Sequence, residues 1–234
     1  MADAPYDPIA DEYYDPSHKT SRNFDATSLI ALRSIVPLVP AGRILEVGAG
    51  RGRCGEFLGI DTARRVVQLD NSARMLAVAP REEALLQVVH SAESLPFPDG
   101  HFSCVAAFLC DPFLGLNFLG ESHRVLSPGG VLVATTPAYE WGAPLRENLQ
   151  LEVNQTRFVT RDGNRVVVPS VLVSREQLTR MLRKVGYADA SIQVQAHRLP
   201  QGTTPVSSDI EQPAKLLGRD AFALDVLYTI VAGR

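Results

Sequence analysis

The stretch RILEVGAGRGRCG, residues 43–55, places four glycines and one glutamate directly after a short apolar run. An apolar strand that ends in a glycine-rich turn and then opens a helix is typical of a nucleotide-binding α/β sheet. The glycines fit two patterns at once. Gly50, Gly52 and Gly55 form the G-x-G-x-x-G of a dinucleotide-binding turn, whereas Glu46, Gly48, Gly50 and Gly52 form E-x-G-x-G-x-G.

The position of Glu46 favours the second pattern. The strand predicted over 43–47 ends at Gly48, and counting from Gly50 would extend it through a glycine, which strands disfavour. A carboxylate beside the turn is poorly placed for a pyrophosphate and suits a ligand with a cationic amino group. Asp70 closes the second predicted strand about 20 residues later, where a carboxylate accepts hydrogen bonds from ribose hydroxyls. The alternative role of Asp70 is to cap the helix that follows it. An adenosine ligand with an amine and no pyrophosphate is S-adenosylmethionine.

The rest of the chain alternates predicted strands and helices. Strands are expected at 43–47, 65–70, 85–91, 101–110 and 131–137, and helices at 24–39, 54–59, 72–79 and 114–126. This alternation predicts a parallel sheet with helices on both faces. The second half predicts a hairpin over 157–168, a helix over 174–186, strands over 190–196 and 223–233, and a polar loop over 197–220. The fold class is therefore α/β, a doubly wound, Rossmann-like, seven-stranded mixed sheet in a single domain.

Four motifs in order carry a resemblance to a known family: ILEVGAGRG (44–52), LDNSARML (69–76), SAESLPFPDGHF (91–102) and RVLSPGGVLV (124–133). Over about residues 40–140 the chain resembles a class I S-adenosylmethionine-dependent methyltransferase of the small-molecule branch that includes the ubiquinone/menaquinone-biosynthesis type. The opening YDPIADEYYD also resembles that family's first segment. The resemblance implies an N-terminal lid and helix over 1–40, a cofactor-binding core over 41–140, a hairpin insertion over 141–173, and a C-terminal helix with antiparallel strands over 174–234.

The resemblance also implies which residues bind the cofactor. Gly48, Ala49, Gly50 and Gly52 would approach the methionine part through their backbone, with Glu46 orienting the turn and the amino group. Asp70 would hold the ribose, with Asn71 and Met75 beside the adenine. Ala92 and Glu93 would form the fourth contacting segment. The family usually has an aspartate before that alanine, where this chain has Ser91. The serine hydroxyl can still accept a hydrogen bond from the adenine amino group, but a weaker one than a carboxylate would accept.

Candidates for the chemistry are Asp111 and His18. Methyl transfer from a sulfonium mainly needs alignment and exclusion of water, and a general base only where the acceptor must lose a proton. Asp111 follows the fourth strand, where it could bind a substrate amine, accept a hydroxyl proton, or simply cap the next helix. His18 lies in the expected lid and could be catalytic or a solvated loop residue. Tyr13, Tyr14, Phe113 and Trp141 could wall a substrate pocket or pack ordinarily.

Composition narrows the class of protein. The net charge of −3 argues against a surface that coats nucleic acid, which would be basic. Three cysteines without a ligand spacing indicate reduced thiols and no structural metal. The acidic, aromatic N-terminus is unlike a signal peptide, and no run approaches the roughly 20 apolar residues of a membrane span. We therefore expect a cytoplasmic protein without membrane or nucleic-acid partners.

The expected function is transfer of a methyl group from S-adenosylmethionine to a small organic acceptor, through oxygen, nitrogen or carbon. Three alternatives stay open: a methyltransferase of tRNA or protein, a nicotinamide-dependent oxidoreductase built on the dinucleotide pattern, and an inactive cofactor-binding assembly module. The hairpin insertion would either shape substrate choice or form a homodimer contact.

Overall fold

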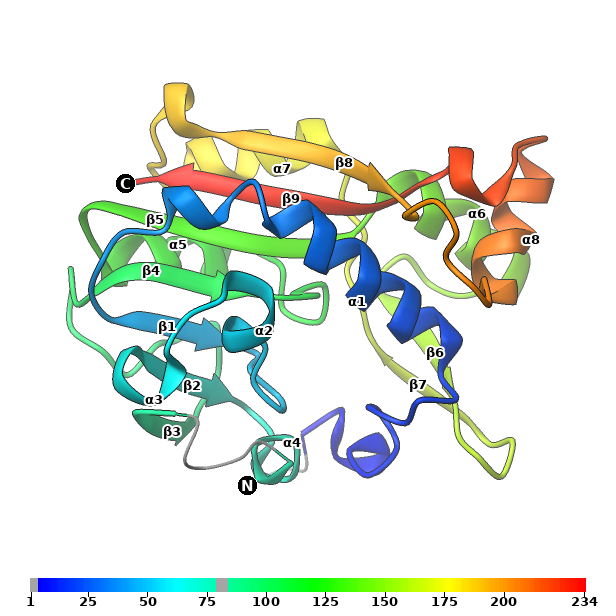
Figure 1. Ribbon diagram of the computed structural model, residues 1–234, viewed down its shortest axis with the longest axis horizontal. Coiled ribbons are helices and arrows are strands. Elements are labelled where there is room, and N and C mark those ends of the chain that lie inside the picture. Colours follow the sequence, from blue (N-terminus) through cyan, green and yellow to red (C-terminus); the bar gives the residue numbers. More distant parts are fainter. Residues whose placement is uncertain (1–3, 79–83) are drawn as a thin grey trace.

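The computed structural model describes residues 4–78 and 84–234 and confirms the predicted α/β fold (Figure 1). A seven-stranded sheet has the order β3-β2-β1-β4-β5-β9-β8. Strands β1 to β5 run parallel, and β9 is antiparallel to both β5 and β8. The strand bounds are Ile44–Val47 (β1), Val66–Asp70 (β2), Leu86–Val89 (β3), Phe102–Ala107 (β4), Leu126–Pro137 (β5), Gln193–Arg198 (β8) and Asp225–Gly233 (β9).

The central strands are apolar because both of their faces are covered. Every residue of β1 and β2 is buried, as is usual for parallel strands between two helical layers. The register pairs Glu46 of β1 with Gln68 of β2 and with Ala106 of β4. The carboxylate of Glu46 therefore starts from the middle of the sheet, close to where β1 ends.

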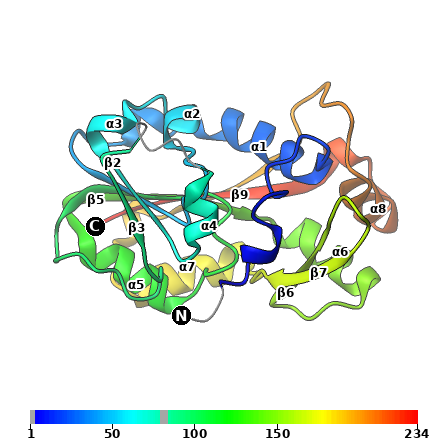
Figure 2. The ribbon, with the colours of Figure 1, turned by 90° about the horizontal axis from the view of Figure 1, so that it is seen from below.

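Two helical layers cover the sheet (Figures 1 and 2). Helices α1 (Lys19–Leu32), α2 (Cys54–Leu58) and α3 (Thr62–Arg65) lie on one side, and α5 (Leu116–Val125) and α7 (Arg175–Lys184) lie on the other. One apolar cluster joins Leu32, Phe57 and Leu58 to the sheet, and a second joins Phe118 and Leu178 to its opposite face. The short helix α4 (Ala73–Ala77) follows β2 at the carboxyl edge.

A third group of elements lies at the far end of the sheet, beyond the carboxyl edge. Helices α6 (Tyr139–Leu149) and α8 (Ser208–Leu216) pack with the start of α1 around Trp141, Leu145 and Ile210. The hairpin of β6 (Gln155–Val159) and β7 (Arg165–Pro169) forms a separate two-stranded sheet. It extends beside the N-terminal segment in both views (Figures 1 and 2). Short 3₁₀ helices cover Asp7–Ile9 (η1), Val36–Leu38 (η2), Asp189–Ser191 (η4) and Ala221–Ala223 (η5).

Several predicted boundaries are wrong. The helix expected over 24–39 begins at Lys19 and ends at Leu32, because Pro37 and Pro40 interrupt the apolar pattern that continues beyond it. The strand expected over 131–137 begins five residues earlier, at Leu126, so Ser127–Gly130 belong to β5. The fourth strand ends at Ala107, three residues before the predicted end. The helix expected over 72–79 covers Ala73–Ala77, and its last predicted residue lies outside the described residues.

Three helices were not predicted: the four-residue α3, α6 and α8. Helix α6 contains Gly142 and Pro144, both poor helix formers, and forms because Trp141 and Leu145 are buried in the third apolar cluster. Helix α8 lies within the stretch predicted to be a polar loop. Ser207 caps its first turn, and Ile210 is its buried contact. The last two strands also begin three and two residues later than expected, at Gln193 and Asp225.

Candidate functional site

The glycine turn after β1 lies at the carboxyl ends of β1 and β2. Gly48 and Gly50 have φ values of +65° and +49°, a backbone region that side chains rarely adopt. Ala49 donates its N–H to the carbonyl of Leu69 at 3.0 Å, and Gly50 donates to Asp70 Oδ2 at 2.9 Å. A Cβ on Gly48 would come within 2.5 Å of the Phe113 ring. The turn is therefore tied to β2 and closely packed against the loop that follows β4.

Glu46 is 1% exposed and holds the end of the turn. Its Oε1 accepts the N–H of Arg53 at 2.5 Å and that of Cys54 at 3.0 Å, at the start of α2. No described residue gives a hydrogen bond to the buried Oε2. Burial raises the pKa of Glu46 to about 7, although the two backbone donors favour its charged form.

Asp70 ends β2, and both of its oxygens accept backbone hydrogen bonds, Oδ2 from Gly50 and Oδ1 from Ser72 at 2.9 Å. Burial raises the pKa of this carboxyl group. The alternative role considered for Asp70, that of helix cap, falls instead to Ser72. Its hydroxyl accepts the N–H of Met75 at 2.9 Å. Each oxygen of Asp70 keeps a second lone pair for a ligand hydroxyl.

A first cavity of about 640 Å³ opens over this turn. Nine of the eleven predicted cofactor residues line it: Glu46, Gly48, Ala49, Asp70, Asn71, Met75, Ser91, Ala92 and Glu93. Gly50 and Gly52 do not line it. A Cβ on Gly52 would instead meet the amide of the buried Gln68, so this glycine serves the packing of the turn.

The first cavity also has charged walls that the sequence did not predict. Arg53 is buried and pairs with Asp25 of α1 at 2.6 Å and with Glu56 at 3.0 Å. Arg51 stacks over the Tyr14 ring, 4.7 Å from its centroid. Asp25 carries no local sequence signal, because only the folded position of α1 brings it to the glycine turn.

A second cavity of about 540 Å³ adjoins the first, and both candidate catalytic residues, Asp111 and His18, line it. The two cavities share four wall residues: Tyr6, Tyr13, Ser21 and Leu109. Leu109 has a φ of +52° and donates its N–H to Thr135 Oγ1 at 2.9 Å. A strained non-glycine residue where two cavities meet is typical of functional sites.

Asp111 is 7% exposed and is supported from behind by Arg146 and Ser170. Burial raises the pKa of Asp111 to about 6, while a hydrogen bond from Ser170 and the charge of Arg146 oppose that rise. Arg146 donates to Ser170 Oγ at 2.6 Å, to the Ser170 carbonyl at 2.7 Å and to the Gln155 carbonyl at 2.8 Å. No local sequence signal points to Arg146 and Ser170, which lie 35 and 59 positions after Asp111.

His18 precedes the first turn of α1, and its ring lies 4.3 Å from that of Phe158 of the hairpin. Its Nε2 is buried, and no described residue bonds to it.

The candidate pocket residues are divided between the cavities. Tyr14 and Phe113 line the first, Trp141 lines the second, and Tyr13 lines both.

The N-terminal segment, residues 4–18, lies between the sheet and the hairpin (Figure 2), and its Tyr6 and Tyr13 line both cavities. On the sheet side, Ser72 bonds to Asp7, Arg74 pairs with Asp11 at 2.7 Å, and Arg51 donates its N–H to Tyr14 Oη at 3.1 Å. On the hairpin side, Tyr6 donates to the Pro169 carbonyl at 3.0 Å, and Arg161 contacts Glu12 and Asp15 at 2.7 and 2.5 Å.

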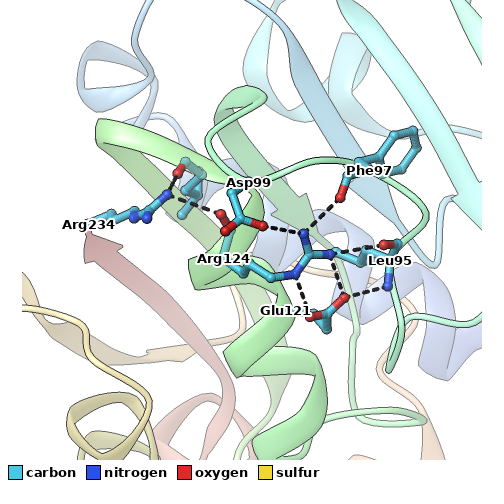
Figure 3. A network of polar contacts seen from close by, with 7 residues as sticks. Leu95, Phe97, Asp99, Glu121, Arg124 and Arg234 are labelled. Atoms are coloured by element: carbon cyan, nitrogen blue, oxygen red, sulfur yellow. Dashed lines mark hydrogen bonds and ion pairs between the residues drawn. The ribbon is translucent and has the colours of Figure 1, made fainter.

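A polar network fixes the segment that follows Ser91–Glu93 (Figure 3). Arg124 of α5 donates to the carbonyls of Leu95 and Phe97, at 3.0 and 2.8 Å, and to Asp99 at 2.8 Å. Both oxygens of Glu121 accept from the same guanidinium, and one also accepts the Leu95 N–H at 2.7 Å. The segment directly after the cavity-wall residues 91–93 is therefore anchored to α5.

Among residues 4–78 and 84–234, no group of His, Cys, Asp and Glu side chains is arranged to hold a metal ion. No helix in the described part of the chain is long and apolar enough to cross a membrane.

Comparisons with known proteins identify relatives. Residues 45–134 match a family model described as a methyltransferase domain. The chain is 30% identical over 156 residues to the malonyl-[acyl-carrier protein] O-methyltransferase of Enterobacter lignolyticus, covering 63% of this chain and 61% of that protein. It is 31% identical over 185 residues to phthiotriol/phenolphthiotriol dimycocerosates methyltransferase 1 of Mycobacterium ulcerans, covering 68% and 63%.

A solved structure extends the likeness to nearly the whole chain. An S-adenosylmethionine-dependent methyltransferase of Thermotoga maritima, described as a possible histamine N-methyltransferase, superposes with a TM-score of 0.61 and 19% identity over 98% of both chains. At that identity the likeness concerns the fold. Against three of its curated relatives, the chain spans 61%, 39% and 44% of their lengths.

Proposed function

The chain belongs to the class I S-adenosylmethionine-dependent methyltransferases, and on that premise we propose that it transfers a methyl group from S-adenosylmethionine to a small organic acceptor. The observation that carries the proposal is the pair of adjoining cavities. The first is lined by the glycine turn and Asp70, the second by Asp111, and both share Tyr6 and Tyr13. Such an arrangement suits a reaction in which one ligand passes a group to another.

The residues of the first cavity fit this cofactor chemically. The buried Glu46 Oε2 has no described hydrogen-bond donor and would accept one from an ammonium group. Asp70 would accept hydrogen bonds from ribose hydroxyls, and Arg53 provides a cation near the turn. Leu69, Met75 and Phe113 give an apolar wall for a purine. The volume of about 640 Å³ is within the ordinary range for cofactor sites.

The cofactor supplies a methyl group on a sulfonium, whose sulfur is already an activated leaving group. The chain would therefore contribute alignment and the exclusion of water. Tyr6, Tyr13 and Leu109 form part of the wall that the two cavities share, so the two ligands would meet beside them. Asp111 would bind the acceptor and take up a proton from it, and its raised pKa makes it a stronger base than an exposed carboxylate.

A small acceptor suits the second cavity better than a macromolecule does. The N-terminal segment, the start of α1, helices α6 and α8, and the β6–β7 hairpin all contribute to its wall. The net charge of −3 offers no general attraction to tRNA. The dinucleotide alternative is not favoured either, because the carboxylate of Glu46 lies beside the turn that would have to hold a pyrophosphate.

The test is calorimetric titration of S-adenosylmethionine and NADH into the unmodified protein and the Asp70→Ala variant. We expect S-adenosylmethionine to bind and NADH not to bind. The substitution should weaken S-adenosylmethionine binding by about 1–3 kcal/mol, because the ribose hydroxyls lose their hydrogen-bond acceptor. Asp209→Ala, a second-cavity variant, controls for general damage. Absence of binding by the folded, unmodified protein would contradict the proposal and favour the assembly-module alternative.

A further inference from the structure

The second cavity is unusually aromatic. Tyr6, Tyr13, Phe24, Trp141 and Phe158 all line it. Their rings contact one another in pairs. Tyr13 is stacked with Phe158 at 6.1 Å between centroids, and Phe24 meets Trp141 edge-on at 4.9 Å.

The polar atoms of two of these rings are already used by the protein. Tyr6 donates its hydroxyl to the Pro169 carbonyl, and Trp141 donates its Nε1–H to the Asp209 carbonyl at 2.8 Å. What remains for a ligand is therefore largely ring surface, which attracts apolar groups and cations.

Asp111 is the buried acidic residue on this wall, which also includes His18 with its buried Nε2. The other charged residues that line the cavity, Lys19, Arg157, Asp209 and Glu211, are exposed or half-buried. Arg146 is the cation behind Asp111, but it is not part of the wall, and its described bonds go to Ser170 and Gln155. The buried charge facing a ligand is therefore negative.

We infer that the acceptor is a small primary or secondary amine on an apolar body, bound as an ammonium ion between Asp111 and the aromatic rings of the second cavity. This inference rests on the proposed function and narrows it to nitrogen methylation. A cation is stabilised by a buried carboxylate and by ring faces, whereas a carboxylate ligand would be repelled by the first and gain nothing from the second.

The reaction balances with the groups at hand. The bound ammonium passes one proton to the Asp111 carboxylate, which leaves a neutral amine with a lone pair. That lone pair forms the new N–C bond to the methyl carbon as the C–S bond breaks and its electron pair stays on sulfur. The product leaves as the methylated ammonium ion, and Asp111 returns its proton to solvent. A pKa of about 6 leaves Asp111 ionised, and able to accept that proton, at neutral pH.

The test compares ligands that share one body and differ in one group: phenethylamine, phenethyl alcohol and phenylacetate, with hexylamine and hexanol as an aliphatic pair. Each is titrated into the protein saturated with S-adenosylhomocysteine, and methylated product is sought by mass spectrometry with S-adenosylmethionine. We expect at least one amine to bind about tenfold or more tightly than its matched alcohol and acid, and to gain one methyl group.

Variants separate this inference from the proposed function. Asp111→Asn should abolish the preference for amine over alcohol, and Phe158→Leu, on the hairpin, should reduce it several-fold, while Asp189→Asn, outside both cavities, should keep it. The inference is overturned if S-adenosylhomocysteine binds but every amine binds no better than its alcohol, or if Asp111→Asn keeps the preference. Failure of S-adenosylhomocysteine to bind would overturn the proposed function, and the inference with it.

Discussion

Three carboxyl groups around the two cavities are buried, Glu46, Asp70 and Asp111, and a fourth, Asp25, is half-buried. Burial raises the pKa of each. The folded protein therefore binds more protons than the unfolded chain between the ordinary and the raised pKa values. Its free energy of unfolding falls as pH rises through that interval. The interval is widest for Glu46, from 4.5 to about 7.

Glu46→Gln should remove part of this pH dependence. A glutamine oxygen can still accept from Arg53 and Cys54, but no charge is buried when the pH rises. Urea unfolding of the unmodified protein should show a loss of stability between pH 5 and 8, and the variant should lose less by on the order of 1–3 kcal/mol. Equal losses in the two proteins would show that Glu46 is not the group that titrates.

Ser91 offers a gain-of-affinity test of the first cavity. Its hydroxyl accepts the N–H of Glu93 at 3.2 Å, and an aspartate could keep that bond while offering a charged acceptor to the adenine amino group. We expect Ser91→Asp to tighten S-adenosylhomocysteine binding by about 1 kcal/mol, measured by calorimetry. Ser94→Asp, three residues on and outside the cavity wall, should leave the affinity unchanged. Similar gains in both variants would mean that a general charge effect, and not the adenine contact, is responsible.

At the scale of elements, the Arg124 network links α5 to the cavity wall (Figure 3). Arg124→Lys keeps the charge but cannot reproduce the fork that reaches Glu121, Asp99 and two carbonyls. We expect a loss of about 1–3 kcal/mol in unfolding free energy and weaker S-adenosylhomocysteine binding, because the segment that follows the wall residues 91–93 loses its anchor. Arg183→Lys, in an exposed pair with Asp189, should change stability by less than about 1 kcal/mol. Equal effects of the two substitutions would contradict a role for the network.

Arg161 of the hairpin contacts the N-terminal segment twice: its side chain pairs with Asp15, and its backbone N–H donates to Glu12, a bond that alanine would keep. The pair is partly exposed, with side-chain exposures of 60% and 18%, so Arg161→Ala should cost little global stability. It should instead free the hairpin and speed proteolysis of residues 4–18 by up to about fivefold, the equivalent of 1 kcal/mol. Arg165→Ala on the same hairpin is the control, and cleavage followed by intact mass is the measurement. Equal cleavage rates in the two variants would mean that the Arg161–Asp15 ion pair does not hold the N-terminal segment in place.

The sequence predicted those elements whose pattern is local. The buried strands β1, β2 and β4 are continuous apolar runs, and the three glycines among residues 48–52 predict the turn. Helices α6 and α8 were missed because they are stabilised by each other and by α1, contacts that no local pattern records. The candidate site follows the same division. Asp70 and Glu46 lie on predicted strand ends, whereas Arg146, Ser170 and Asp25 reach the cavities only through tertiary packing.

At the scale of the molecule, the first cavity draws its walls from the N-terminal segment, α1, the carboxyl ends of β1 and β2, the loops after β3 and β4, and Pro169 of the hairpin. A ligand there touches parts of the chain more than 160 positions apart, from Pro5 to Pro169. Binding should therefore stabilise the chain as a unit and not one element alone.

Thermal unfolding should report this coupling as one transition that moves with ligand. S-adenosylhomocysteine at 100 times its dissociation constant adds about 2.7 kcal/mol by mass action. For a chain of this size that corresponds to a rise of roughly 5–10 °C in Tm. NADH at the same concentration should leave Tm unchanged, and Asp70→Ala should need more ligand for the same rise. A ligand-dependent split into two transitions would show that the N-terminal segment and hairpin unfold apart from the sheet, and that the two cavities do not form one cooperative site.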